Sequence, residues 1–109
     1  MATAYKILGQ AAPSANTAAT LYTVPSATEA IVSALTICNR GNAAATYRIA
    51  FVPSGESLAS KHYFAYETSV GAYDTTSADT KFGLATGDVV SVYASTADLT
   101  FIVSGVELT

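Results

Sequence analysis

The residues of this chain that have the chemistry for catalysis are few. His62 is the only histidine and Cys38 the only cysteine among the 109 residues. Cys38 lies in an apolar run, residues 31–38, where a thiol is expected to be a small buried hydrophobe. His62 alternates with Phe64 and Tyr66, which indicates a packed or surface histidine rather than a general base. Because no acid, base and nucleophile can be assembled from such a set, we expect no enzyme.

Four aspartates are the remaining candidates for a metal site. They lie in or beside expected turns, where carboxylates can gather around calcium but where an aspartate also ordinarily caps the local backbone. Their spacing fits no calcium-binding loop, and zinc would need about four ligands that these residue types do not supply in the usual set. We therefore expect neither a metal nor a cofactor. The aspartates are Asp74, Asp79, Asp88 and Asp98.

The composition excludes two classes of partner and favours a third. Charged residues make up 12% of the chain, the formal net charge is −3, and Lys and Arg together number five. Nucleic acids and anionic membranes are bound by concentrated basic residues, so we expect neither as a partner. A surface with so little charge is easily desolvated, which favours lasting contact with other proteins.

The sequence shows neither the pattern of a signal peptide nor that of a membrane-spanning helix. No stretch approaches the roughly 18 apolar residues of a membrane helix. The N-terminal residues lack a long apolar run after a basic start, so we expect no signal peptide and synthesis in a reducing cytoplasm.

Short runs of Val, Ile, Thr, Tyr and Phe, closed by Pro, Gly, Asn or Asp, predict an all-β chain. About seven or eight strands, spaced by roughly 8–12 residues, indicate a single antiparallel β-sandwich over residues 1–109, either jelly-roll or immunoglobulin-like. We expect strands at residues 4–10, 18–24, 29–39, 45–52, 61–67, 82–84, 89–95 and 99–108, with a possible short strand at 70–73.

Turn residues and side-chain alternation predict how these strands are arranged. The sequence Arg40-Gly41-Asn42 predicts a hairpin between the third and fourth strands, because Gly and Asn accept positive φ. Residues 96–98 predict a second hairpin, between the last two strands. The third strand is apolar at both alternating sets of positions, so we expect both of its faces to be covered. In the last strand the alternation shifts beyond Gly105, which predicts a β-bulge there.

Seven tyrosines and no tryptophan offer a large amphipathic contact area. Exposed tyrosines are favoured at protein interfaces and can stack on sugars, whereas half-buried ones would only border the core. Alternation predicts that Tyr63 and Tyr66 point to opposite faces of their strand. We expect outward-facing interface positions in this middle part of the chain, at Tyr63, Val70, Tyr73, Phe82 and Leu84.

Three runs of sequence resemble small virion structural proteins of tailed bacteriophages, particularly those of marine and cyanobacterial phages. They are strand-and-turn patterns and include no catalytic motif. The resemblance implies a β-sandwich component of a phage head or tail that carries no cofactor. The runs cover residues 21–53, 61–70 and 84–109, and their most telling segments are residues 37–41, 44–50 and 88–95.

The resemblance and the low charge together predict a capsid decoration or cement protein, which would bind the shell of major capsid protein in the virion. By analogy with other small phage sandwiches, we expect a cyclic homo-oligomer, with a trimer favoured. Two alternatives remain open. One is a structural component of the neck, tail or fibre, and the other is a module that recognises glycans on the host surface.

Overall fold

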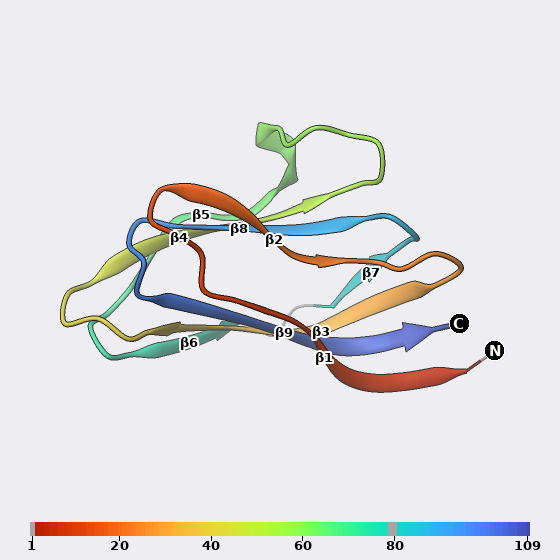
Figure 1. The fold of residues 1–109 in the computed structure, drawn as a ribbon, viewed down its shortest axis with the longest axis horizontal. Coiled ribbons are helices and arrows are strands. Elements are labelled where there is room, and N and C mark those ends of the chain that lie inside the picture. The colour runs from red at the N-terminus through yellow and green to blue at the C-terminus, as the bar shows by residue number, and fades with distance from the viewer. Residues whose placement is uncertain (1, 79–80) are drawn as a thin grey trace.

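The computed structural model describes residues 2–78 and 81–109, and within them two antiparallel sheets pack face to face as a β-sandwich (Figure 1). The five-stranded sheet has the order β1-β9-β3-β6, with β7 also paired to β3, and the four-stranded sheet has the order β2-β8-β4-β5. The expected all-β sandwich is confirmed. The elements are β1 (Thr3–Ala11), β2 (Thr17–Thr23), β3 (Glu29–Asn39), β4 (Ala45–Val52), the 3-10 turn η1 (Ser60–His62), β5 (Tyr63–Val70), β6 (Thr75–Ala78), β7 (Phe82–Leu84), β8 (Val89–Ala94) and β9 (Leu99–Leu108).

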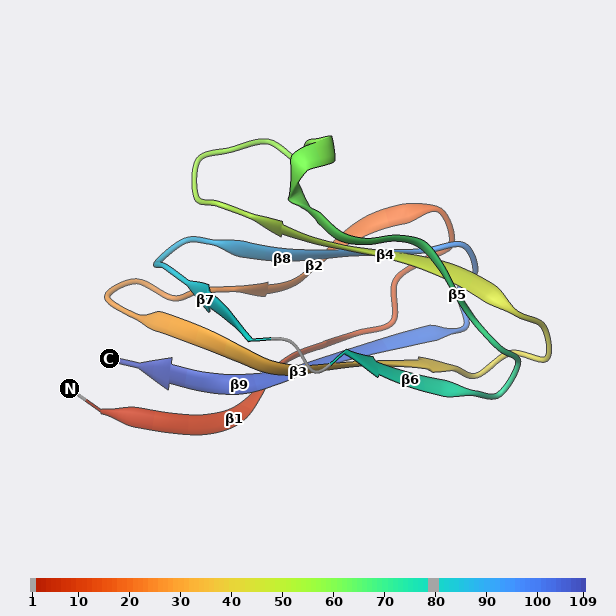
Figure 2. The same cartoon turned by 180° about the vertical axis from the view of Figure 1, so that it is seen from behind.

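The strand order identifies the sandwich as a jelly roll. From β1 to β4 the chain alternates between the two sheets, and it does so again through β8 and β9 (Figure 2). With β6 and β7 taken as one interrupted strand along β3, eight strands follow the double Greek-key order. An immunoglobulin-like sandwich instead pairs several consecutive strands within one sheet.

Both expected hairpins are wrong, because β3 and β4, and likewise β8 and β9, lie in different sheets. Gly41 and Asn42 are not among the residues with positive φ, so the turn that a two-residue hairpin needs does not form. The chain instead crosses from one sheet to the other. Together with the β1–β2 and β5–β6 connections, these crossings lie at the left end of the sandwich in Figure 1.

Buried Asn39 explains how the β3–β4 crossing is held. Its Nδ2 donates to the carbonyl oxygens of Ala43 at 2.9 Å and Gly71 at 3.1 Å, and its Oδ1 accepts from the Gly41 amide at 2.9 Å. The amide of the next residue, Arg40, donates to the carbonyl oxygen of Asp98 at 2.9 Å. Three crossings are therefore bound to one another by contacts that are distant in sequence.

The core fills the space between the sheets. Its largest fully buried side chains include Phe101, Leu35, Ile37 and Ile49, and the Phe101 ring meets that of Tyr47 edge-on at 6.2 Å. Each such side chain stabilises the fold by about 1.5–3 kcal/mol through removal from water.

The bulges of the five-stranded sheet lie in β1 and β3, the two strands that pair with β9, and not in β9 itself. The expected bulge at Gly105 is therefore wrong. Burial alternates without interruption along β9. The register shifts occur instead at Leu8 of β1 and at Ser33 of β3. Gly105 faces inward, where an added Cβ would overlap the carbonyl oxygen of Ile31, so the glycine allows a close approach of β3.

The bulge at Ser33 changes which side chains of β3 face the core. Val32, Leu35 and Ile37 are buried, whereas Ile31 is exposed and Cys38 is half-buried. The expectation that both faces of this strand are covered is therefore wrong, and so is the expectation of a buried Cys38.

The strand limits differ from the expected ones mainly in the middle of the chain. The residues before Tyr63 form η1, β5 extends to Val70, and β6 lies where a polar loop is expected. The possible strand at 70–73 is wrong, because Tyr73 sits in a turn with φ of 54°.

Candidate functional site

The outer surface of the five-stranded sheet is apolar and uncovered. The cross-strand register places Tyr5 of β1, Val106 of β9 and Ile31 of β3 in one outward row, with Ile7 in the next row. Tyr5 is 70% exposed, Ile7 57% and Ile31 40%. We call this surface the apolar face, and it consists of Tyr5, Ile7, Ile31, Ile102, Val106 and Leu108.

Charge is confined to the ends of the apolar face. Among the outward strand positions of the five-stranded sheet in residues 2–78 and 81–109, Glu29 is the only charged one, in the last row beside Leu108. At the opposite end Arg40, just beyond β3, donates from Nε to the Thr100 hydroxyl at 2.9 Å. The centre of the face therefore consists of aliphatic, aromatic and small hydroxyl side chains.

Two charged residues of the same strands turn inward. Lys6 of β1 pairs with Glu107 of β9 at 2.8 Å, and the hydroxyl of Tyr22 on β2 donates to the same carboxylate. The Lys6 ammonium and the Tyr22 hydrogen bond lower the pKa of Glu107. Burial and the hydrogen bond to Glu107 raise the pKa of Tyr22. This cluster links the two sheets and keeps both charges off the apolar face.

The outer surface of the four-stranded sheet is hollowed instead of flat. Residues 53–62 fold back over it (Figure 1), and Ala50, although it points outward, is 1% exposed. Beside this loop lies a cavity of about 550 Å³ lined by Leu58, Ala59, Ser60, Tyr63 and Tyr66. An adjoining hollow of about 200 Å³ shares Leu58 and Tyr63 and is also lined by Arg48 and Tyr93. We call these two spaces the tyrosine cleft.

His62 holds the loop that forms one wall of the cleft. Its Nδ1 accepts from the Ala59 amide at 2.9 Å, so the neutral ring carries its proton on Nε2, which lies 3.0 Å from Glu56 Oε1. Lys61 pairs with the same oxygen at 3.1 Å. These two donors, His62 first, lower the pKa of Glu56. The histidine is buried and packed, which is one of the two positions expected for it.

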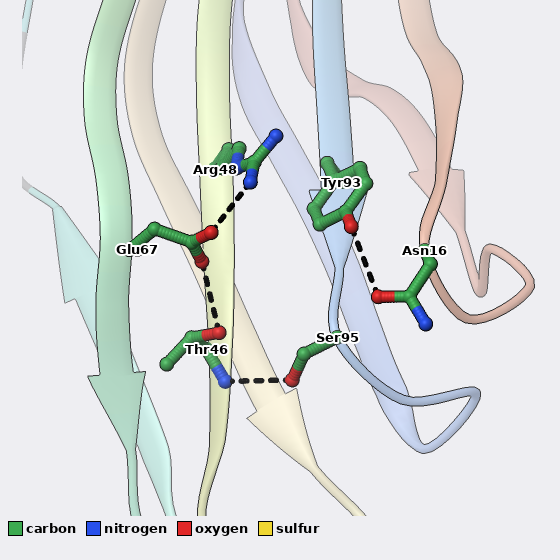
Figure 3. Close-up of polar contacts among 6 residues, drawn as sticks. All are labelled: Asn16, Thr46, Arg48, Glu67, Tyr93 and Ser95. Carbon is green, nitrogen blue, oxygen red and sulfur yellow. Dashed lines mark hydrogen bonds and ion pairs between the residues drawn. The ribbon is translucent and has the colours of Figure 1, made fainter.

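Arg48 lies at the centre of the four-stranded face, between two tyrosine rings. Its guanidinium carbon is 4.5 Å from the Tyr66 ring centroid and 4.1 Å from that of Tyr93. Nη2 donates to Glu67 Oε1, and Thr46 donates to the other oxygen of that carboxylate at 3.0 Å (Figure 3). The hydrogen bonds from Arg48 and then Thr46 lower the pKa of Glu67. The pair is neutral as a unit and fixed in position.

Further hydrogen bonds continue this polar network across the sheet (Figure 3). The Tyr93 hydroxyl donates to Asn16 Oδ1 at 2.9 Å, and the Thr46 amide donates to the Ser95 hydroxyl at 3.0 Å. Arg48 Nε is buried and has no hydrogen-bond partner within the described residues. Arg48 therefore has one donor beside the cleft that no described residue uses.

Tyr63 and Tyr66 lie on the same side of β5, so the expectation of opposite faces is wrong. Their ring centroids are 4.9 Å apart in an edge-to-face arrangement at 81°. The register of β5 against β4 shifts twice, and Glu67 has a positive φ of 51°. These irregularities interrupt the alternation on which the expectation rests.

The five expected interface residues do not form one surface. Val70 and Leu84 are buried in the core, so the expectation that they point outward is wrong. Phe82 faces inward at the edge of the sandwich, where its ring lies 4.4 Å from that of Phe51. Tyr73 is 74% exposed in the turn between β5 and β6, and Tyr63 lies in the tyrosine cleft.

Local pairing explains why Val70 and Leu84 are buried. The bulges of β5 change the side to which its last residue points. β7 pairs with β3 so that Leu84 lies opposite Ala30, an inward position.

Sequence reasoning missed the residues that do share a surface. The apolar face uses both ends of the chain, and its cross-strand rows depend on bulges that the sequence does not mark. One signal was available: the sequence predicts strands only, so it offers no predicted helix that could cover the outside of either sheet. Some apolar outward positions must then remain exposed.

The carboxylates of the described residues are not arranged as a metal site. In residues 2–78 and 81–109 no three His, Cys, Asp or Glu side chains gather as metal ligands would. Asp88 accepts from the amides of Ser54 and Ala85, both at 2.9 Å, and Asp74 accepts from that of Thr75. Asp79 lies outside the described residues.

Within the part of the chain that is described, no helix has the length and apolar character needed to span a membrane.

Comparison of the chain with protein-family models, with curated proteins and with solved structures gave no match. The two outer faces of the sandwich are therefore the features from which a function can be inferred.

Proposed function

We propose that this protein is a phage virion structural protein of the decoration or cement type, which binds the capsid shell through its apolar face. The observation that carries the proposal is the uncovered apolar face, with Tyr5, Ile7 and Ile31 exposed on a sheet whose centre has no charge. An apolar patch of this kind marks a contact surface in a soluble protein. The resemblance to phage virion proteins supplies the partner, the major capsid protein.

The shape of the apolar face suits a broad and shallow contact. An outer sheet surface that no loop covers can meet another broad surface without either partner changing shape. Its aliphatic and hydroxyl side chains cost less to desolvate than charged side chains would. Many copies on a repeating shell would add their separate contacts, so each contact can be modest. A low charged fraction, 12% of the chain, is consistent with such a role.

A homotrimer around a symmetry axis of the shell is the second part of the proposal. In this arrangement the apolar face lies on the shell, and other surfaces make the contacts between copies. Light scattering on the purified protein tests this part. A trimer that dissociates when the apolar face is altered would assign that face to contacts between copies instead of to the shell.

Purified virions provide the deciding experiment. We expect mass spectrometry to find the protein in the particle, and cryo-electron microscopy to place it on the shell lattice with the apolar face toward the capsid protein. Absence from the lattice would overturn the proposal. A low copy number, as in a neck, tail or fibre, would favour the alternative structural role.

Charge placed on the apolar face tests the surface itself. We expect Ile7→Glu and Ile31→Glu to fold normally and to be lost from the particle, because a carboxylate would have to be desolvated in the contact. Tyr73→Glu is the matched control, since Tyr73 is a large hydrophobic residue that is more exposed than either isoleucine but lies in the β5–β6 turn. Incorporation of both isoleucine variants at the normal level would show that another surface binds the shell.

A further inference from the structure

We propose that the tyrosine cleft is a binding site for a neutral sugar, a pyranose unit of an uncharged glycan. The cleft lies on the four-stranded sheet, away from the apolar face, so the inference does not depend on the capsid proposal. Of the tyrosines expected at an interface, Tyr63 lines the cleft and Tyr73 does not. Tyr66, Arg48 and Tyr93 line it as well.

The aromatic surface of the cleft matches a sugar ring. A pyranose has an apolar side made of C–H groups, which packs against an aromatic ring, and a rim of hydroxyls. Tyr63 and Tyr66 stand edge to face, and Tyr66 is 58% exposed. Neither phenol hydroxyl has a hydrogen-bond partner among the residues the structure describes, so both can bond to a ligand.

The charges around the cleft favour a neutral ligand. Arg48 is paired with Glu67, and Lys61 is paired with Glu56. A phosphate or a carboxylate would require a cation that is not already neutralised, and it would also meet the two glutamates. A sugar hydroxyl both donates and accepts, so it can bond to neighbouring donors and acceptors of this kind.

Arg48 contributes a donor that is already oriented. Two tyrosine rings and the Glu67 carboxylate hold the guanidinium, and its buried Nε has no partner in the described chain. The planar guanidinium presents its N–H donors in a fixed fork, so a sugar hydroxyl in the adjoining hollow meets donors that are already in place. Because the Arg48 side chain is already fixed in the free protein, it loses little conformational entropy when a ligand binds.

The dimensions of the cleft agree with a small saccharide. Cavities that bind small molecules usually measure roughly 300–1,000 Å³, and the larger space here is about 550 Å³ with an adjoining hollow of about 200 Å³. A proline-rich peptide is a different class of ligand that also uses aromatic grooves. It fits less well, because a slot for proline needs nearly parallel rings, and these two rings meet at 81°.

Titration with defined sugars tests the site. The probes are neutral disaccharides and tetrasaccharides of glucose, galactose, mannose and N-acetylglucosamine, followed by amide NMR spectra of the purified protein at millimolar ligand. We expect at least one sugar to shift the signals of residues 58–67, Arg48 and Tyr93, while signals of the apolar face stay unchanged. No shift with any sugar in the panel overturns the proposal.

Matched tyrosine variants make the test specific to the cleft. We expect Tyr63→Ala and Tyr66→Ala to weaken binding by about tenfold or more, and Tyr66→Phe to weaken it less because the ring remains. Tyr73→Ala and Tyr5→Ala are the controls and should bind normally, with thermal melting used to confirm that every variant is folded. Equal loss in the controls, or stronger binding of a proline-rich peptide than of any sugar, would contradict a sugar site.

Discussion

The two outer faces of this sandwich are built from the same kinds of strands but present different surfaces. On the five-stranded sheet the side chains are apolar and lie open to solvent. On the four-stranded sheet an arginine, a glutamate and three tyrosines are arranged beside a loop that covers outward-facing Ala50. The difference arises because residues 53–62 fold over the four-stranded sheet, whereas no described segment covers the apolar face. A loop that covers part of a sheet creates a cleft beside it, and an uncovered sheet leaves a broad surface for contact.

The largest loss of stability is expected in the core that both faces share. Phe101→Ala removes a fully buried ring that contacts Tyr47 and should lower the free energy of unfolding by about 3–5 kcal/mol. Chemical denaturation gives the value. Phe51→Ala is the comparison: Phe51 is only half-buried at the sandwich edge, so we expect a smaller loss. Equal losses would mean that the edge aromatics belong to the core.

A smaller loss is expected when the loop over the four-stranded face is released. His62→Ala removes the buried ring that accepts from the Ala59 amide and should cost about 1–3 kcal/mol. Limited proteolysis should then cut within residues 53–62, and the tyrosine cleft should lose its wall. Unchanged resistance to protease would show that other contacts hold the loop.

Acid should weaken the link between the sheets at Glu107. The pKa of Glu107 is lower in the folded chain than in the unfolded chain, where it is about 4.3. The ionised carboxylate therefore stabilises the fold at pH values above about 4.3, and this stabilisation is lost as the pH falls through the pKa of the folded state. We expect Glu107→Gln to be less stable by about 1 kcal/mol at neutral pH and to lose less stability on acidification. Unfolding curves from pH 7 to acid measure both effects, and parallel curves for the two proteins would refute the assignment.

The smallest change in stability is expected on the apolar face. Ile7→Ser should alter the free energy of unfolding by only about 0.5 kcal/mol or less, because the side chain is already in contact with water. Tyr66→Ala should be similarly mild on the other face. The two variants should nevertheless separate by function, with particle incorporation reduced in the first and sugar binding reduced in the second. Loss of both functions in either variant would remove the distinction between the faces.

Strand positions were predictable because they depend on neighbouring residues. The limits expected for β3, β4, β7 and β9 are those observed. Alternation of apolar side chains and the nearby Gly, Pro and Asn residues suffice for this purpose. The sandwich follows from the number and spacing of such strands.

Strand pairing and the composition of the faces were not predictable in the same way. The crossing after β3 depends on contacts of Asn39 with Gly71, more than thirty positions along the chain, whereas the local turn sequence favours a hairpin. Bulges at Leu8, Ser33 and within β5 reverse the side to which later residues point. One such reversal places Tyr63 beside Tyr66.

The position of β9 has a consequence for how the chain folds as it leaves the ribosome. β9 is translated after β1 and β3 but lies between them, and it supplies the pairing of β1, with Thr3 opposite Leu108. β1 must therefore wait, unpaired, until β9 has been translated. Pairing across so long a separation is slow, and the waiting strands expose apolar side chains.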